Sequence, residues 1–100
     1  MRRGKYNAVK VRIDGFVFDS KKEAKRYAEL KLIMKKNLII HPRYPCDVNG
    51  IHICTYVGDF EYLTPDGKVV LEDVKGVRTP LYRLKRKLVE ALYDIKITEV

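Results

Sequence analysis

Alternating apolar and polar residues mark the extended segments of this chain. In "AVKVRIDGFVF" apolar residues alternate at Val9, Val11 and Ile13 before a turn at Asp14-Gly15, which predicts a β-hairpin over residues 7–19. Further on, Asn49-Gly50 separates "LIIHPRYPCDV" from the long segment "IHICTYVGDFEYL", and a Pro-Asp-Gly turn precedes "KVVLEDVKG". Because these turn residues are typical of hairpins, we expect a three-stranded antiparallel meander over residues 38–76. Pro42 and Pro45 indicate that its first strand is interrupted or lies at an edge.

Two other segments have the spacing and the start signals of helices. In "DSKKEAKRYAELKLIMKKN", Ser20 is a good N-cap residue and Glu23 completes a capping box. The second helix is expected to begin at Thr79-Pro80, an N-cap followed by proline at the first helical position. The apolar stripe of the first helix comprises Ala24, Tyr27, Ala28, Leu30 and Met34, and that of the second comprises Leu81, Leu84, Leu88 and Leu92.

The order of the elements predicts the fold class. "IKITEV" closes the chain as a short strand, which can join the same sheet parallel to a neighbour through a helical crossover. One domain fits a chain of 100 residues. We therefore expect an α+β fold in which residues 1–6 form a basic arm, residues 7–19 a hairpin, and residues 20–100 an αβββαβ core with a mixed sheet flanked by two helices.

Charge and hydropathy restrict the partners. The formal net charge is +8, which favours a polyanion such as nucleic acid, although excess basic residues can also simply solvate a surface. Since no apolar run approaches the roughly 18 residues of a membrane span, no membrane partner is expected. The basic N-terminus is not followed by an apolar signal segment, so a cytoplasmic protein is predicted.

The cysteines and histidines offer little chemistry on sequence grounds. A two-residue hairpin at Asn49-Gly50 sets Cys46 opposite Ile53 and points Cys54 to the other face, so no disulfide is expected. Two cysteines alone do not make a zinc site. We interpret His41 and His52 as structural or surface residues. A Cys-His nucleophile built on Cys54 stays as a weak alternative, because no acid is placed to orient the histidine.

Three charged residues stand in a segment that otherwise predicts a buried strand. In "VVLEDVKG", Asp73 and Lys75 share one face of the strand, while Glu72 points the other way. Burial of a charge is costly unless it is paired or binds a metal, so we expect Glu72 in a salt bridge or at a strand edge. The turn at residues 64–67 brings Asp59 of the preceding strand to about the level of Asp73.

This arrangement suits metal-assisted hydrolysis of a phosphodiester. Mg²⁺ prefers oxygen ligands and is often held by one or two carboxylates plus water and substrate phosphate. Asp59 and Asp73 are therefore the predicted metal ligands, with the backbone carbonyl of Val74 as a further one. A bound ion would acidify a water molecule and neutralise charge on the phosphate, and Lys75 would orient that water.

The same residues resemble a known motif. The chain has "GD" at Gly58-Asp59 and, after thirteen further residues, "DVK" at Asp73-Val74-Lys75. This pattern resembles the core motif of the PD-(D/E)xK nuclease superfamily. The superfamily usually has a proline where this chain has Gly58. The segments "FDSKKEAKRYAELKL" and "YVGDFEY" resemble a family of small phage-encoded proteins grouped with Holliday-junction-resolvase-like enzymes.

The resemblance implies a restriction-endonuclease-like αβββαβ core and a Mg²⁺- or Mn²⁺-dependent endodeoxyribonuclease that acts on branched or four-way junction DNA of a phage. The implied location is the cytoplasm of the host cell or of a bacterium. It also implies a carboxylate from the first helix, for which Glu23 is the match, so the implied catalytic residues are Glu23, Asp59, Asp73 and Lys75. The alternative interpretation of Glu23 is the capping-box partner of Ser20.

Basic residues outside this motif predict how DNA would be held. The expected DNA contacts are Arg2, Arg3 and Lys5 in the arm and Arg78, Tyr82, Lys85 and Arg86 near or in the second helix. Lys85 is the candidate for a phosphate contact, and its alternative is a solvated lysine. A chain this small is expected to act as a homodimer, placing two sites on two strands. A non-catalytic nucleic-acid-binding module and a protein-interaction factor are the other two hypotheses.

Overall fold

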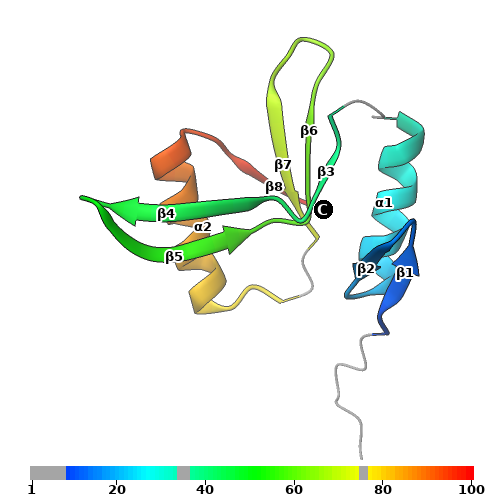
Figure 1. Cartoon of the computed structure of the whole chain (residues 1–100), viewed down its shortest axis with the longest axis horizontal. Helices are drawn as coiled ribbons and strands as arrows, with labels where there is room; N and C mark the ends of the chain where they lie inside the picture. Colours follow the sequence, from blue (N-terminus) through cyan, green and yellow to red (C-terminus); the bar gives the residue numbers. More distant parts are fainter. Residues whose placement is uncertain (1–8, 34–36, 75–76) are drawn as a thin grey trace, which may run out of the picture.

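Two helices lie on opposite sides of a four-stranded mixed sheet (Figure 1). The structure is a computed structural model that describes residues 9–33, 37–74 and 77–100. Its elements are β1 (Val11–Ile13), β2 (Phe16–Phe18), α1 (Lys21–Ile33), β3 (Ile39–Ile40), β4 (Arg43–Val48), β5 (Ile51–Val57), β6 (Phe60–Leu63), β7 (Val69–Asp73), α2 (Pro80–Tyr93) and β8 (Ile97–Glu99). The fold is therefore α+β, in the predicted order of hairpin, helix, antiparallel strands, helix and closing strand.

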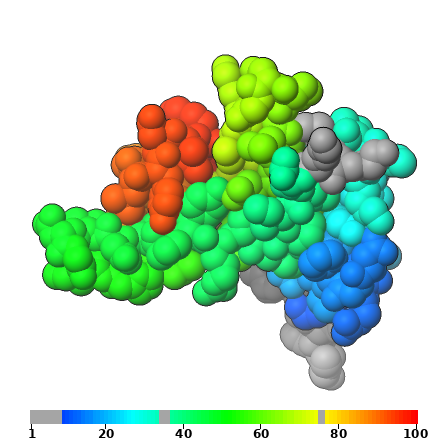
Figure 2. Space-filling view, turned by 45° about the horizontal axis from the view of Figure 1, so that its top comes forward, coloured from blue at the N-terminus to red at the C-terminus, as the bar shows by residue number. Residues whose placement is uncertain are grey.

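The main sheet has the strand order β3-β6-β7-β8. β6 is antiparallel to β3 and to β7, whereas β8 runs parallel to β7 after the crossover through α2. The parallel closing strand confirms the prediction made from "IKITEV". β4 and β5 form a separate two-stranded sheet, and this hairpin extends from the body of the molecule as an arm (Figure 2).

The predicted meander is present, but two of its strands are broken at the same level. The first strand divides into β3 and β4 at His41-Pro42, and the long second strand divides into β5 and β6 at Gly58-Asp59. The expectation of one continuous strand over "IHICTYVGDFEYL" was therefore wrong. His41 N–H donates to the carbonyl of Asp59 (3.0 Å), and Gly58 N–H donates to the carbonyl of Pro42 (2.9 Å). The pairing thus continues through the break, although the two halves belong to different sheets.

α1 begins as the capping pattern predicts and covers one face of the sheet. The hydroxyl of Ser20 accepts from Glu23 N–H (3.1 Å), and Glu23 Oε1 accepts from Asp19 N–H (2.8 Å), so backbone donors at the helix start are satisfied. Ala28 is exposed, contrary to prediction, and Met34 lies outside the described residues. The core on this side comprises Phe18, Ala24, Tyr27, Leu30, Phe60 and Tyr62.

α2 begins at its predicted cap but buries a different face from the one expected. Thr79 Oγ1 accepts from Tyr82 N–H (3.1 Å). Leu81 and Leu84 are 61% and 62% exposed, so the predicted leucine face was wrong at these positions, although Leu88 packs against the core. The helix is turned so that the ring of Tyr82 and the side chain of Val89 enter the core. That core comprises Cys46, Tyr56, Leu71, Tyr82, Val89 and Ile97.

The hairpin β4–β5 corrects the predicted relation of the two cysteines. Asp47 pairs with His52 and Cys46 with Cys54, which leaves Ile53 as an extra residue at a register shift. This β-bulge turns Cys54 to the same face as Cys46. Both thiols are free, so the absence of a disulfide agrees with the expectation although the predicted facing was wrong.

Candidate functional site

Asp59 lies at the strand break, beside the end of β7. Phe60 pairs with Glu72 in the β6–β7 ladder, so Asp59 stands level with Asp73, as the turn length predicted. The backbone holds Asp59 in place, because its N–H donates to the carbonyl of Glu72 (3.0 Å) and its Oδ2 accepts from Val74 N–H (2.6 Å). Val74, expected to offer its carbonyl to a metal, thus supports the site through its amide.

Asp73 lies on the α2 side of the sheet at the wall of a polar pocket. Its side chain is buried, with 3% of the residue exposed, and it accepts a short hydrogen bond from the hydroxyl of Tyr56. The pocket has a volume of about 270 Å³, and Lys85 of α2 lies in its wall with Nζ 3.4 Å from the carbonyl of Thr55. The pocket is lined by Thr55, Tyr56, Val57, Asp73, Thr79, Leu81, Tyr82 and Lys85.

Glu23, in the first turn of α1, lies beside Asp59. The residue is 4% exposed. Its Oε1 caps the helix start, while its Oε2 lies 3.6 Å from Nε2 of His41. The two interpretations of Glu23 are therefore compatible, since each carboxylate oxygen serves a different neighbour.

His41 is the residue of this site that sequence reasoning missed. Glu23, His41 and Asp59 each place one possible ligand atom in this site, and these three atoms lie within 4.8 Å of one another. The backbone of His41 has φ +55°, an uncommon conformation for a residue with a side chain. The sequence carried one hint, because Pro42 predicted an interruption at this point, but only the fold places the imidazole beside α1.

The proximity of the carboxylates perturbs the protonation of Asp59. Burial and then the nearby carboxylate of Glu23 raise the pKa of Asp59 to about 7, although the hydrogen bond from Val74 N–H acts in the opposite direction. Burial and the hydrogen bond to Asp73 raise the pKa of the Tyr56 hydroxyl well above its usual range. The site thus holds concentrated negative charge with limited access to water, a condition that a bound cation would relieve.

Glu72 lies on the opposite face of β7 from Asp73, as predicted, and is neutralised. Arg26 of α1 donates to both of its carboxylate oxygens, Nε to Oε1 at 2.8 Å and Nη2 to Oε2 at 2.6 Å. The hydroxyl of Tyr62 also donates to Oε2. The salt bridge keeps the pKa of Arg26 above its ordinary value. Neighbouring residues of β7 therefore have opposite roles, one joining the sheet to α1 and the other joining the candidate site.

The predicted DNA-binding residues fall into three groups. Arg2, Arg3, Lys5 and the predicted catalytic residue Lys75 lie outside the described residues. Arg78, Tyr82 and Arg86 all hydrogen-bond to the carboxylate of Glu99, each at 2.7 Å. Lys85 lies in the wall of the Asp73 pocket. Tyr82 lines the same pocket, so two of the residues predicted in α2 lie beside Asp73.

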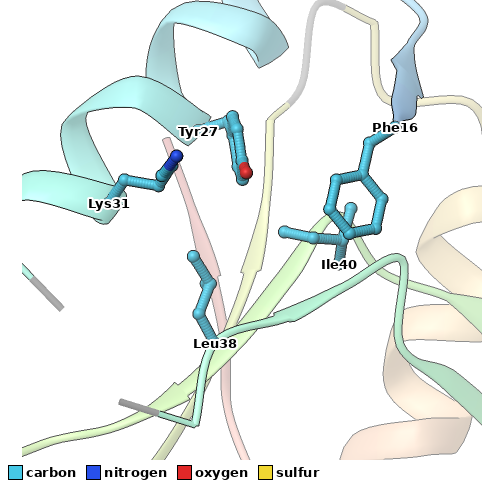
Figure 3. A pocket seen from close by; sticks show the side chains of 5 residues that line it. All are labelled: Phe16, Tyr27, Lys31, Leu38 and Ile40. Carbon is cyan, nitrogen blue, oxygen red and sulfur yellow. The ribbon is translucent and has the colours of Figure 1, made fainter. Parts of the chain in front are cut away.

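A second, mainly apolar pocket lies between α1, the β1–β2 hairpin and the segment around β3. Figure 3 shows side chains from α1, the β1–β2 hairpin and the β3 segment around an open space, and its volume is about 340 Å³. The lining residues are Phe16, Tyr27, Lys31, Leu38 and Ile40. Lys31 pairs with Asp14 at 2.6 Å. This lining offers shape but no cluster of reactive groups, so the carboxylate site is the stronger candidate.

Comparison with known proteins supplies a family. Residues 3–100 match a family model described as a protein of unknown function, DUF1064. The chain belongs to the DUF1064 family. No curated protein and no solved structure matches it. The two described helices of this DUF1064 protein are both too short and too polar to cross a membrane.

Proposed function

We propose that this DUF1064 protein is a metal-dependent DNA endonuclease of the PD-(D/E)xK type that hydrolyses phosphodiester bonds, with branched or junction phage DNA as its substrate class. The observation that carries the proposal is the position of Asp59 at the strand break, where its carboxyl group interacts with Glu23 of α1 and with Asp73 of β7. These positions are the ones that the resemblance to nucleases implies. The adjacent Glu72, which the resemblance does not use, is instead neutralised by Arg26.

The donor set suits a divalent cation. Carboxylate oxygens are the ligands that Mg²⁺ and Mn²⁺ prefer. Burial and the nearby carboxylate of Glu23 raise the pKa of Asp59, and a bound cation would favour its charged form. Asp59 and Asp73 would hold the ion, with Glu23 as a further ligand. A bound ion would supply Lewis acidity toward the phosphate and an acidified water molecule.

The protein's own residues would then position the substrate. Lys85, in the wall of the Asp73 pocket, would contact a phosphate oxygen of the scissile strand. The hydroxyl of Tyr56 fixes the orientation of Asp73, which favours a preorganised ligand. Lys75, for which the resemblance implies the orientation of the attacking water, follows Val74 directly in the sequence.

The rest of the molecule is compatible with a DNA partner. The net charge of +8 would attract the phosphate backbone from solution. A protein with extents of 44 × 39 × 21 Å presents one site to a duplex, so a homodimer would be needed to cut two strands symmetrically. The free thiols fit the reducing cytoplasm, where this DNA would be met.

One observation favours a non-catalytic DNA-binding module as the second candidate. Asp73 is 3% exposed and already accepts the hydroxyl of Tyr56, so its carboxylate would have to exchange part of that hydrogen bonding for a metal. If it does not, the acidic cluster is structural and the basic surface alone carries the function.

Cleavage assays with matched variants test the proposal. Purified protein is incubated with single-stranded, duplex, flap and four-way junction DNA in the presence of Mg²⁺ or Mn²⁺. We expect cleavage of at least the branched substrates, a loss of about 100-fold or more in Asp73→Ala and in Asp59→Asn, and retained DNA binding in both. Asp66→Asn, in the exposed turn between β6 and β7, is the control and should cleave like the wild type.

The outcomes separate the hypotheses. Undiminished cleavage by Asp73→Ala would refute the proposed site. Binding that weakens steeply with salt, without cleavage of any substrate, would support the binding module. Sedimentation of the protein with and without junction DNA measures the expected homodimer.

A further inference from the structure

His41 adds a nitrogen donor to a pair of carboxylates, and this changes the kind of metal that the site would hold. We infer that Glu23, His41 and Asp59 form a first-row transition-metal site that binds Mn²⁺ or Co²⁺ in preference to Mg²⁺ and Ca²⁺. The inference rests on the proposed function in so far as Glu23 and Asp59 are ligands of the ion proposed there and His41 is a further one, but it concerns binding and stands or fails without DNA.

The three donors are close enough to share one ion. They lie within 4.8 Å of one another. An ion about 2.1 Å from each ligand requires ligand atoms roughly 3 to 4 Å apart, so each side chain needs to move inward by less than about 1 Å. Side-chain rotation alone supplies such a movement, and the backbone of the site can stay in place.

Each donor is held by contacts that leave a ligand atom available in the right place. Glu23 Oε1 is engaged by Asp19 N–H, which directs Oε2 toward His41. Asp59 Oδ2 is engaged by Val74 N–H, which fixes the carboxylate at the strand break. Two of the three ligands are thus positioned by backbone N–H groups, a supporting arrangement of the kind that orients metal ligands.

The position of His41 is maintained by its backbone and by an aromatic neighbour. Its N–H donates to the carbonyl of Asp59 (3.0 Å), which couples two of the ligands directly. Its ring packs against Phe18 with a centroid distance of 5.9 Å. The left-handed backbone at φ +55° is a conformation that costs free energy and is often found at ligand sites. These features direct Nε2 to the buried Glu23 although 36% of the His41 side chain is exposed.

The exposed part of His41 gives the site an entrance. The side chain of Glu23 is 5% exposed, whereas His41 and Asp59 are both partly exposed, so an ion from solvent would reach Glu23 past these two residues. Imidazole is a good ligand for transition metals and a poor one for Mg²⁺ and Ca²⁺, which prefer oxygen. The nitrogen donor therefore provides the selectivity, whereas the two carboxylates provide the charge.

A simpler arrangement would give the same geometry without a metal. A protonated His41 would form an ion pair with Glu23 across 3.6 Å, and metal binding would then be independent of the imidazole. The test must therefore detect the nitrogen ligand itself.

The test is metal binding to the full chain in the absence of DNA. Calorimetric titration is performed with Mn²⁺, Co²⁺, Mg²⁺ and Ca²⁺, and electron spin-echo spectroscopy of the Mn²⁺ complex reports coupling to a coordinated nitrogen. We expect Mn²⁺ to bind at least about tenfold more tightly than Mg²⁺, and Co²⁺ more tightly than Mn²⁺, with a ¹⁴N coupling in the Mn²⁺ spectrum.

The second histidine provides the control. His52 pairs with Asp47 on the exposed hairpin, so His52→Ala should retain the affinities and the ¹⁴N coupling. His41→Ala and His41→Gln should lose the coupling and reduce the preference for Mn²⁺ over Mg²⁺ to about twofold or less. Circular dichroism checks that both variants are folded.

Two results would overturn the inference: a wild-type Mn²⁺ complex without ¹⁴N coupling, or equal affinity for Mn²⁺ and Mg²⁺. The spectrum of the wild type decides this even if the His41 variants do not fold. Nitrogen-coordinated Mn²⁺ without cleavage of any DNA would leave this inference intact and remove the nuclease proposal. Cleavage that depends on Asp73 in a protein without nitrogen coordination would do the reverse.

Discussion

At the scale of single residues, Asp59 is a strongly perturbed carboxyl group of the site. Its pKa in the folded protein is about 7 against an ordinary value of 3.8, because burial and then Glu23 disfavour the charged form. Between these two values the folded state binds more protons at Asp59 than the unfolded state does. The contribution of Asp59 to the free energy of unfolding is therefore present below about pH 4 and is lost as the pH rises to about 7.

This sign leads to a prediction for the metal-free protein. Urea denaturation with a chelator present measures the free energy of unfolding of Asp59→Asn and of the wild type. As the pH rises from about 4 to about 7, the variant should gain stability relative to the wild type. The reason is that asparagine does not acquire the buried charge. Asp66→Asn should follow the wild type, and parallel pH profiles for Asp59→Asn and wild type would contradict the assignment.

Gly58, the neighbour of Asp59 at the strand break, is constrained by its contact with β7. A Cβ atom at this position would lie 2.7 Å from Cδ1 of Leu71 and 3.4 Å from Cγ of Pro42. Leu71 is fully buried. The sequence resemblance expects proline here, but the close approach of the strand break to β7 leaves room only for glycine.

We therefore predict that Gly58→Ala destabilises the fold by about 1–3 kcal/mol through overpacking. The same substitution in a Leu71→Ala background should cost less, because the clashing methyl group is gone. Chemical denaturation of the four proteins gives the coupling energy. Equal costs in the two backgrounds would show that the contact with Leu71 is not the cause.

At the scale of elements, the pair of Arg26 and Glu72 joins α1 to β7. Glu72 is 1% exposed and Arg26 about a quarter exposed by their side chains, with Nη2 and Oε2 2.6 Å apart. A buried carboxylate that loses its only described cationic partner is strongly unfavourable. The register of α1 on the sheet, and hence the position of Glu23, depends on this pair.

Removal of one partner should therefore cost more than removal of both. We expect Arg26→Met to destabilise the protein by about 3–5 kcal/mol, and the double variant Arg26→Met with Glu72→Met to recover much of that loss. Lys10→Met breaks an exposed pair with Asp19 and should cost less than about 1 kcal/mol. Strictly additive losses in thermal or urea denaturation would contradict the buried-pair interpretation.

The start of α2 was predicted correctly, but the face that this helix buries was not. Its start at Thr79-Pro80 was readable because capping is local. Which of its apolar residues are buried depends on hydrogen bonds to β8, where Tyr82 and Arg86 both reach Glu99. Leu81, Leu84 and Leu92, which the periodicity assigned to the core, are exposed, whereas Leu88 packs against the core.

At the scale of the whole molecule, the net charge of +8 predicts DNA binding that weakens steeply with salt. Arg83 and Lys87 are exposed on α2, whereas the guanidinium of Arg86 bonds to Glu90, Glu99 and the carbonyl of Ile97. Substitution of Arg83 or Lys87 by Gln should therefore lower the slope of log affinity against log salt by about one unit. Arg86→Gln should mainly reduce stability.

Fluorescence anisotropy with junction DNA between low and physiological salt measures these slopes. An affinity that does not change with salt would remove DNA as the partner and leave a protein-interaction factor. A loss of slope in Arg86→Gln equal to that in Arg83→Gln, without loss of stability, would show that Arg86 leaves Glu99 to contact DNA.

Much of the architecture could be read from the sequence because its causes are local. The caps at Ser20 and Thr79, the turns at Asp14-Gly15 and Asn49-Gly50, and the alignment of Asp59 with Asp73 all follow from interactions within a few residues or across one tight turn. The opposed directions of Glu72 and Asp73 follow from the alternation of side chains along a strand.

The tertiary structure decided the features that depend on contacts between distant segments. The strand break at Gly58-Asp59, the β-bulge that aligns Cys46 with Cys54, and the buried face of α2 each result from packing against another element. His41 joins Glu23 because β3 pairs with β6 beneath α1, a pairing that no local pattern encodes. The sequence by itself thus determined the elements and two of the acidic positions, whereas the fold determined which side chains share one site, because long-range packing sets the distances between them.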